Sequence, residues 1–128
     1  MKDMTQEDKK LLLKDLCARL PYGLLVKTPD HFTPQVVEGI NNELEVIVQK
    51  NLCYSLLYEV KPYLRPMSNM TPDEFEEFTN IVEHISIGKL QINIADPEAF
   101  DWLNARHFDY RGLIEKGLAL EAPEGMYN

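Results

Sequence analysis

The spacing of apolar residues changes twice along this 128-residue chain, and the change narrows the folds open to it. Apolar side chains recur at helical spacing over residues 5–20, at the spacing of short strands over residues 22–58, and mostly at helical spacing again over residues 72–116. Strands grouped between helical segments are typical of α+β proteins. We expect one α+β domain, in which a small antiparallel sheet is packed by three to four helices.

The first predicted helix covers residues 5–20. Thr5 can cap it, because the hydroxyl can accept a hydrogen bond from the amide three residues on. We expect its apolar face to be buried and its opposite face, which carries Arg19, to lie in water. Cys17 belongs to the apolar face, so we expect the two thiols of the chain, Cys17 and Cys53, to be free and largely buried. The apolar face consists of Leu12, Leu13, Leu16, Cys17 and Leu20.

Residues 22–58 predict the sheet. Short apolar runs are separated there by residues that favour turns, among them Asn41 and Asn42, which tolerate the positive φ of a tight hairpin. Four such runs predict a small curled antiparallel sheet, and the pattern is also compatible with an SH3-like barrel. The expected strands are 23–28, 35–40, 43–48 and 55–58.

Residues 59–70 predict a hinge between the sheet and the later helices, because two prolines favour an extended path there. An extended segment would place Lys61, Tyr63 and Arg65 on one side. Tyrosine and arginine are favoured as interface anchors, so these side chains could bind a partner. The structural interpretation, which we favour, has Tyr63 packing against the helices and Arg65 bridging to an acidic side chain.

Residues 72–84 have the clearest helix start in the sequence. Thr71 can cap the helix, and Glu74 can return a hydrogen bond to the Thr71 amide. The helix has five carboxylates and no Lys or Arg. Such a strip, which includes Glu74, Glu76 and Glu77, is usually only a solvated face, but it could instead bind a basic protein partner. The predicted core stripe is Phe75, Phe78, Val82 and Ile85.

The last third of the chain predicts one strand and two helices. Apolar and polar residues alternate over 89–94, as in a half-buried strand, and a helix is expected over 97–106. A shorter helix is expected over 110–116, capped by Asp109 and ended by Gly117. The tail from residue 121 to 128 contains proline and glycine, and we expect it to be loosely attached.

The run from His107 to Arg111 has the most varied chemistry. In a functional interpretation His107 acts as a base or donor, Asp109 orients it and Arg111 holds an anion. In the structural interpretation, which we favour, Asp109 is a helix cap and Arg111 pairs with an acidic neighbour. The sequence has no metal-ligand spacing, nucleophile motif or phosphate loop. We therefore expect no catalytic residue, no metal and no cofactor.

The net charge of −8 lies entirely in the second half of the chain. Residues 1–65 carry nine basic and nine acidic side chains, whereas residues 66–128 carry four and twelve. Because phosphate contacts come from Lys and Arg, direct nucleic-acid binding is disfavoured. We expect that the polar N-terminus is not a signal peptide, and no apolar run approaches the ~20 residues of a membrane helix. We expect a cytoplasmic protein with no membrane association.

Three blocks of the sequence resemble a group of small uncharacterised proteins of gut bacteria and their prophages or mobile elements. The blocks are LLLKDLCARLPYG (11–23), KPYLRPMSNMT (61–71) and DWLNARHFDYRGLIEKGLALEAPEGMY (101–127). The resemblance implies a cytosolic accessory protein carried by a phage or mobile element. It implies no activity, cofactor or site residue.

These observations lead to one preferred function and two alternatives. We expect a non-enzymatic interaction or regulatory module whose acidic C-terminal half binds a basic protein partner. The first alternative is a nucleic-acid-associated protein that makes contact through Lys27, Lys50, Lys61 and Arg65. The second is a small enzyme built on His107 and Asp109.

Overall fold

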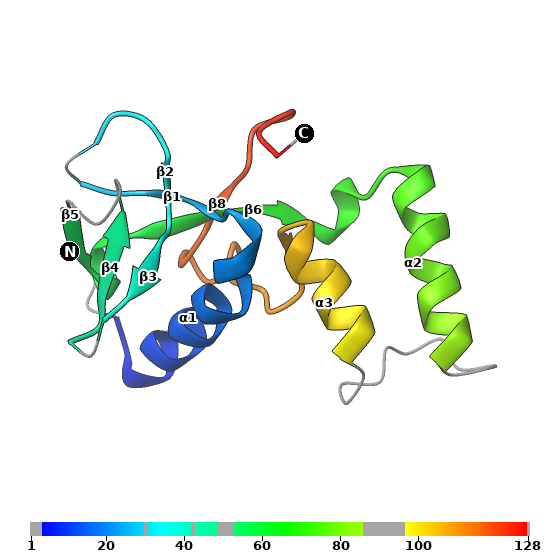
Figure 1. Cartoon of the computed structure of the whole chain (residues 1–128), viewed down its shortest axis with the longest axis horizontal. Coiled ribbons are helices and arrows are strands. Elements are labelled where there is room, and N and C mark those ends of the chain that lie inside the picture. The colour runs from blue at the N-terminus through cyan, green and yellow to red at the C-terminus, as the bar shows by residue number, and fades with distance from the viewer. Residues whose placement is uncertain (1–3, 30, 42, 49–52, 86–96, 128) are drawn as a thin grey trace.

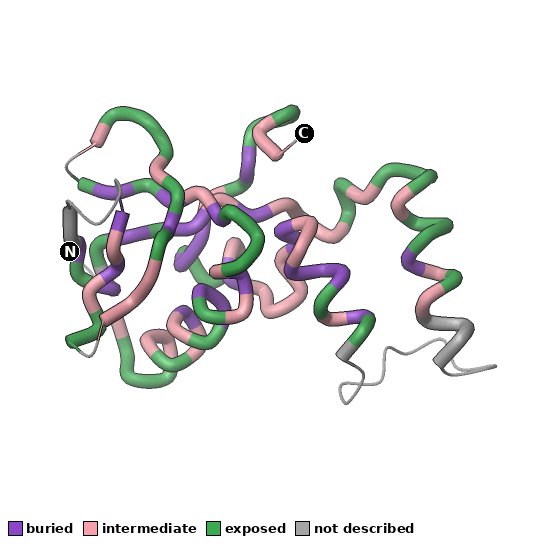
Figure 2. Tube along the Cα trace, in the orientation of Figure 1, coloured by how far each residue is buried: buried purple, intermediate pink, exposed green. Residues whose placement is uncertain are grey.

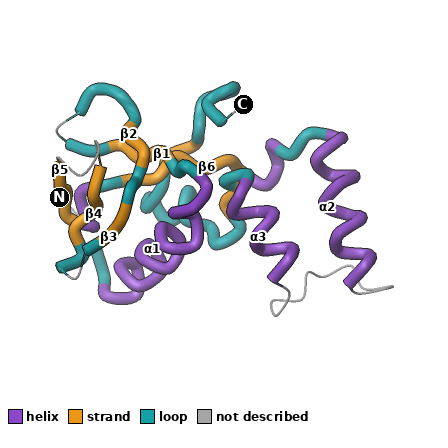
Figure 3. The backbone as a smooth tube through the Cα atoms, viewed as in Figure 1, coloured by secondary structure: helices purple, strands orange, loops and turns teal. Residues whose placement is uncertain are grey.

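The computed structural model describes residues 4–29, 31–41, 43–48, 53–85 and 97–127. It confirms the α+β class: three α-helices and eight strands are present among these residues (Figures 1 and 3). The expected strand at 89–94 lies outside the described residues. None of the described helices combines the length and the apolar character needed to cross a membrane.

Helix α1 spans Gln6–Arg19 and begins as predicted, since the Thr5 hydroxyl accepts a hydrogen bond of 3.0 Å from the Asp8 amide. Its buried face differs from the prediction. Asp15 and Arg19 are fully buried beside Leu12 and Leu16, whereas Cys17 is exposed. The expectation that Arg19 lies in water and Cys17 lies in the core was wrong, because an ion pair allows the two charged residues to enter the interior. The side chain of Cys53 lies outside the described set.

The strands form two sheets rather than one. In the smaller sheet, β4 (Glu45–Val48) lies between β3 (Gly39–Ile40) and β5 (Cys53–Leu56), and both pairings are antiparallel. The larger sheet has the order β2-β1-β6-β7, with β8 also on β6. The strand predicted at 35–40 is therefore divided between the two sheets. The strands of the larger sheet are β1 (Leu25–Lys27), β2 (Gln35–Val36), β6 (Lys61–Pro66), β7 (Phe108–Asp109) and β8 (Leu120–Glu121).

Strand β6 is the centre of the larger sheet. It pairs antiparallel with β1 and parallel with β7 and β8, so the sheet is mixed. The predicted hinge at 59–70 was therefore wrong, although its extended path was right. Pro62 and Pro66 argue against a strand in the sequence, but the segment pairs with strands from distant parts of the chain. An SH3-like barrel is not confirmed by these pairings.

The hairpin between β3 and β4 turns at Asn41. Its side-chain oxygen accepts hydrogen bonds from the amides of Glu43 and Glu45 at 2.9 and 3.0 Å. Among the described residues of this turn, Leu44 has the positive φ, 61°, and Asn42 lies outside them. Single-turn 3₁₀ helices follow α1 and flank β6, at Leu20–Tyr22, Leu57–Glu59 and Met67–Asn69.

Helix α2 spans Pro72–Ile85 and its predicted start is confirmed. The Thr71 amide donates to Glu74 Oε1 at 3.0 Å, and the Glu74 amide donates to Thr71 Oγ1 at 3.1 Å. The predicted core stripe was wrong at Phe75, which is 62% exposed, and right at Phe78, which is buried. The side chains of residues 82 and 85 lie outside the described set.

Helix α3 spans Pro97–Ala105, close to the predicted bounds. The helix predicted at 110–116 is instead a series of turns. Both Asp109 oxygens accept from backbone amides, of Leu113 and Ile114, at 2.9 Å. The turns end at Gly117, whose φ of 76° permits the Leu118 amide to donate back to the Leu113 carbonyl. Asp109 and Gly117 thus play their predicted roles on a shorter element.

Two apolar cores result from this arrangement. The larger lies between α1, the strands and the turns after β7; it includes Leu12, Val26, Leu64 and Leu113. The smaller lies between α2 and α3 and includes Phe78, Trp102 and Phe108. Helix α3 stands between α1 and α2, which places α2 at one end of the molecule (Figure 1). Exposed and half-buried residues run along most of α2 (Figure 2).

Candidate functional site

The first two turns of α2 expose negative charge and an apolar ring. Asp73, Phe75 and Glu76 are all exposed, and among the described side chains of the helix Phe75 is the most exposed large apolar one. Asp73 and Glu76 form no ion pair with any residue that the structure describes. Asp73 and Phe75 are two positions apart and point to different sides of the helix, with Glu76 between them around its axis. We call the surface that these three residues form around the start of α2 the acidic face. Asp101 and Glu98 of the neighbouring α3 are exposed as well and add to the negative charge at this end of the molecule.

An ion pair fixes the helix that presents the acidic face. The Arg65 guanidinium donates to Glu74 Oε2 at 2.8 Å and to Oε1 at 2.7 Å. It also lies over the Phe108 ring, 4.2 Å from the centroid. Hydrogen bonding to Arg65 lowers the pKa of Glu74 to about 2, although partial burial opposes the shift. Arg65 of strand β6 therefore holds the first turn of α2. It pairs with an acidic side chain, as the structural interpretation expected.

The third predicted acidic residue, Glu77, forms hydrogen bonds within the protein and also remains partly exposed. Its Oε1 accepts from Trp102 Nε1 at 3.0 Å and from Arg106 Nη2 at 2.9 Å, while 51% of its side chain stays exposed. Trp102 also contacts the Phe78 ring at 5.2 Å between centroids. Of the three predicted acidic residues, Glu74 is bound by Arg65, and Glu77 is bound by Trp102 and Arg106 but stays half exposed. Only Glu76 is fully available to a partner.

His107 is buried and is not oriented by Asp109. It has a φ of 62°, and its ring stacks on Tyr127 with the centroids 3.9 Å apart. Burial lowers its pKa to about 4, and the positive charge of Arg19 adds to the shift, so the imidazole is neutral at pH 7. The two carboxylate oxygens of Asp109 are used by backbone amides. The structure therefore does not assemble the predicted His–Asp arrangement.

Arg111 belongs to a buried ionic cluster that the sequence reasoning missed. Asp15 accepts from Arg19 Nε at 2.9 Å, from Arg19 Nη2 at 3.0 Å and from Arg111 Nη1 at 2.6 Å. Arg19 also donates to the Phe108 carbonyl at 2.6 Å. The available signal was the i, i+4 spacing of Asp15 and Arg19 on one helical face. Arg111 pairs with an acid, as the structural interpretation expected, but with one in α1.

The C-terminal tail is anchored, contrary to the expectation of loose attachment. Tyr127 Oη accepts from the Leu25 amide at 3.0 Å and donates to the Tyr63 carbonyl at 2.7 Å. The β1–β6 register pairs Val26 with Pro62, so Leu25 and Tyr63 would be the next pair. The tyrosine hydroxyl therefore bridges two strands where they separate. Burial raises the pKa of Tyr127 to about 12.

Those cations of the nucleic-acid alternative that the structure describes do not form one surface. Arg65 is bound to Glu74, and Lys50 lies outside the described residues. Lys61 and Lys27 are exposed and face each other across β6 and β1. Tyr63 is half-buried and contributes its carbonyl to the Tyr127 contact. A nucleic-acid surface makes several phosphate contacts, and the two described lysines can supply only a few of them.

Within the described residues, no three side chains of His, Cys, Asp or Glu lie close enough together to hold a metal ion. No protein-family model, curated protein or solved structure matches this chain.

Proposed function

We propose that this protein is a non-enzymatic interaction module of the cytoplasm, which docks a basic protein partner on the acidic face of α2. The observation that carries the proposal is the 62% exposure of Phe75 on a helix that also exposes Asp73 and Glu76 and has no Lys or Arg. The cytoplasmic placement rests on the composition and on the resemblance of the three sequence blocks.

The chemistry of the acidic face defines the partner. The free energy falls when a partner removes a large exposed ring from water, and aromatic side chains often dominate the binding energy of an interface. Carboxylates beside the ring attract a positively charged partner and suppress acidic ones. The partner is therefore a protein with an apolar pocket bordered by Lys or Arg.

The fold prepares the acidic face for binding. Glu74 and Glu77 hold α2 to β6 and to α3, on the side away from Phe75. A helix that is already fixed loses less conformational entropy on binding than a segment that must first become ordered. Glu74 and Glu77 thus position the helix, whereas Asp73, Phe75 and Glu76 contact the partner.

The test begins with a quantitative pull-down from the native host, using the full chain as bait, and continues with the purified partner. Phe75→Ala and the double reversal Asp73→Lys/Glu76→Lys should each weaken the binary complex. Removing an interface hot spot costs about 2 kcal/mol or more, which is roughly thirtyfold in Kd. Glu115→Lys/Glu124→Lys is the matched control, since both residues are exposed and outside the acidic face.

The control variant has the same change in net charge and should bind like the wild type. Equal losses in the control and in the Asp73/Glu76 variant would show a non-specific charge effect and would contradict the proposal. Binding of an acidic partner, or of nucleic acid in place of protein, would also contradict it.

A further inference from the structure

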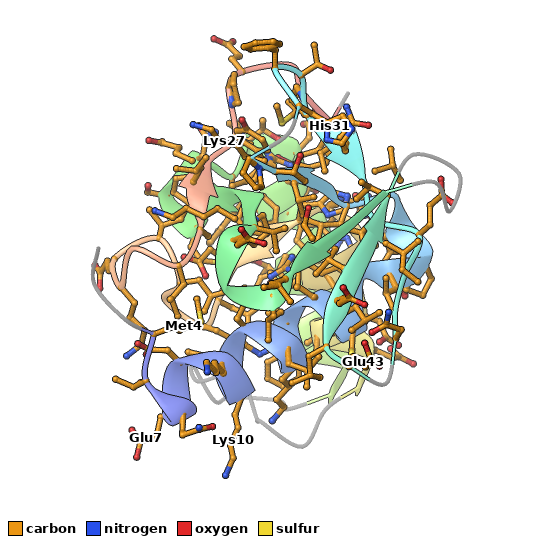
Figure 4. All side chains as sticks on the ribbon, turned by 90° about the vertical axis from the view of Figure 1, so that its left-hand side faces the viewer. Met4, Glu7, Lys10, Lys27, His31 and Glu43 are labelled. Atoms are coloured by element: carbon orange, nitrogen blue, oxygen red, sulfur yellow. The ribbon has the colours of Figure 1, made fainter. Side chains whose placement is uncertain are left out.

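A small groove lies on the other side of the molecule from the acidic face. It has a volume of about 200 Å³ and is formed where the end of β1, the 3₁₀ turn before β6, the start of β6 and β8 meet. Figure 4 looks at this side and labels Lys27, which belongs to the groove. The groove is lined by Lys27, Thr28, Pro29, Glu59, Lys61 and Leu120.

Two lysines oppose each other in this groove. Lys27 and Lys61 are direct partners in the antiparallel β1–β6 register, so their side chains lie on the same face of the sheet. Both are exposed, and neither forms an ion pair with any residue in the described part of the chain. Like charges directly opposite each other destabilise a sheet. A bound anion would remove that repulsion.

The remaining lining residues restrict the size and character of the anion. One oxygen of Glu59 accepts from the Leu56 amide at 3.1 Å, and the Thr28 hydroxyl is engaged with His31 Nδ1 at 2.7 Å. Pro29 and Leu120 add an apolar wall. A volume of about 200 Å³ is below that of drug-sized sites and suits a compact ligand.

We propose that this groove binds a small phosphomonoester. The phosphate dianion would lie between the Lys27 and Lys61 ammonium groups, whose summed charge it matches, and the short apolar body would contact Pro29 and Leu120. The Glu59 carboxylate repels a second anionic group, so the ligand must carry a single anionic group that faces the two lysines. This proposal is independent of the acidic face.

The test is a titration of the full chain with phenyl phosphate and with inorganic phosphate, followed by calorimetry and by amide chemical shifts. Phenyl phosphate should bind saturably and more tightly than inorganic phosphate, with shifts at β1 and β6. Lys27→Gln and Lys61→Gln should each weaken binding about tenfold, as expected for a charge-assisted hydrogen bond. Glu59→Gln should strengthen it.

Lys10→Gln is the matched control, because Lys10 is exposed on α1 and lies at the opposite end of this side of the molecule (Figure 4). It should leave the affinity unchanged. The proposal is overturned by non-saturable binding, or by equal effects of Lys10→Gln and the two groove variants. It is also overturned if a single-stranded oligonucleotide binds through the same lysines and phenyl phosphate does not.

Discussion

Arg65 and Glu74 join the central strand of the larger sheet to the first turn of α2 through two hydrogen bonds of 2.7 and 2.8 Å. Glu74 also closes the capping box with Thr71. One carboxylate therefore determines both where α2 begins and how it is oriented on the sheet. The acidic face depends on this pair for its position, although neither residue belongs to it.

The first prediction concerns the loss of that pair. Glu74→Gln should lower the free energy of unfolding at pH 7 by about 1–3 kcal/mol, since charge-assisted hydrogen bonds to Arg65 are lost. Glu76→Gln, on the exposed side of the same helix, should change it by less than about 0.5 kcal/mol. Urea denaturation measures both. Equal effects of the two substitutions would contradict the assigned role.

The pH dependence of stability tests the same pair. The pKa of Glu74 falls from its ordinary 4.5 to about 2 on folding, so the unfolded chain binds the proton more tightly. The contribution is complete above pH 4.5 and is lost as the pH falls toward 2. Glu74→Gln should remove this part of the acid sensitivity, and an unchanged pH profile would contradict the assignment.

The second prediction concerns the buried cluster. Asp15→Asn should destabilise the protein by about 3–5 kcal/mol, because the Arg19 guanidinium loses its counter-charge in the interior. Lys14→Gln, at an exposed neighbouring position, should cost less than about 0.5 kcal/mol. Thermal unfolding compares the variants, and a mild effect of Asp15→Asn would show that water reaches Arg19.

The third prediction concerns the tail. Tyr127→Phe removes the hydroxyl that bridges Leu25 and Tyr63 and should cost about 1–3 kcal/mol, because a partly buried amide and a carbonyl lose their partner. The Leu25 amide should then exchange faster with deuterium. In the wild type, one tyrosine should titrate near pH 12. Since its folded pKa is raised from 10, the associated stability is present below pH 10 and is lost toward pH 12. Unchanged exchange at Leu25 would contradict the anchoring.

The fourth prediction concerns Cys17. Because it lies on the exposed side of α1, its thiol should react with a thiol reagent without denaturant. Wild type and Cys17→Ser should differ by one fast equivalent under native conditions. If the two proteins react equally until denaturant is added, Cys17 is protected in solution.

Local features of this fold could be predicted from the sequence. The caps at Thr5 and Thr71 and the turn at Gly117 depend on a few consecutive residues, so their hydrogen bonds follow from residue type and spacing. The α+β class followed from the change in apolar spacing. The role of Asp109 as a cap was also predicted, although the element it caps is a set of turns.

Features that depend on distant contacts could not be predicted in this way. Strand β6 contains prolines, and its parallel partners come from the C-terminal part of the chain. Helical spacing alone places Arg19 on the wet face, because the Phe108 carbonyl that accepts from it, and the Arg111 that shares Asp15, reach it only in the fold. Helical spacing alone predicts that Phe75 and Phe78 are both buried, since only the position of α3 decides which ring is covered.

The salt dependence of association tests docking on the acidic face directly. The rate at which the purified basic partner associates with the wild type should fall steeply as salt rises, because exposed charges are screened beyond about 8–10 Å at physiological ionic strength. Asp73→Lys/Glu76→Lys should lower that rate and flatten the salt dependence, whereas Phe75→Ala should mainly speed dissociation. An association rate that is independent of salt, or that is unchanged by the double reversal, would contradict docking on the acidic face.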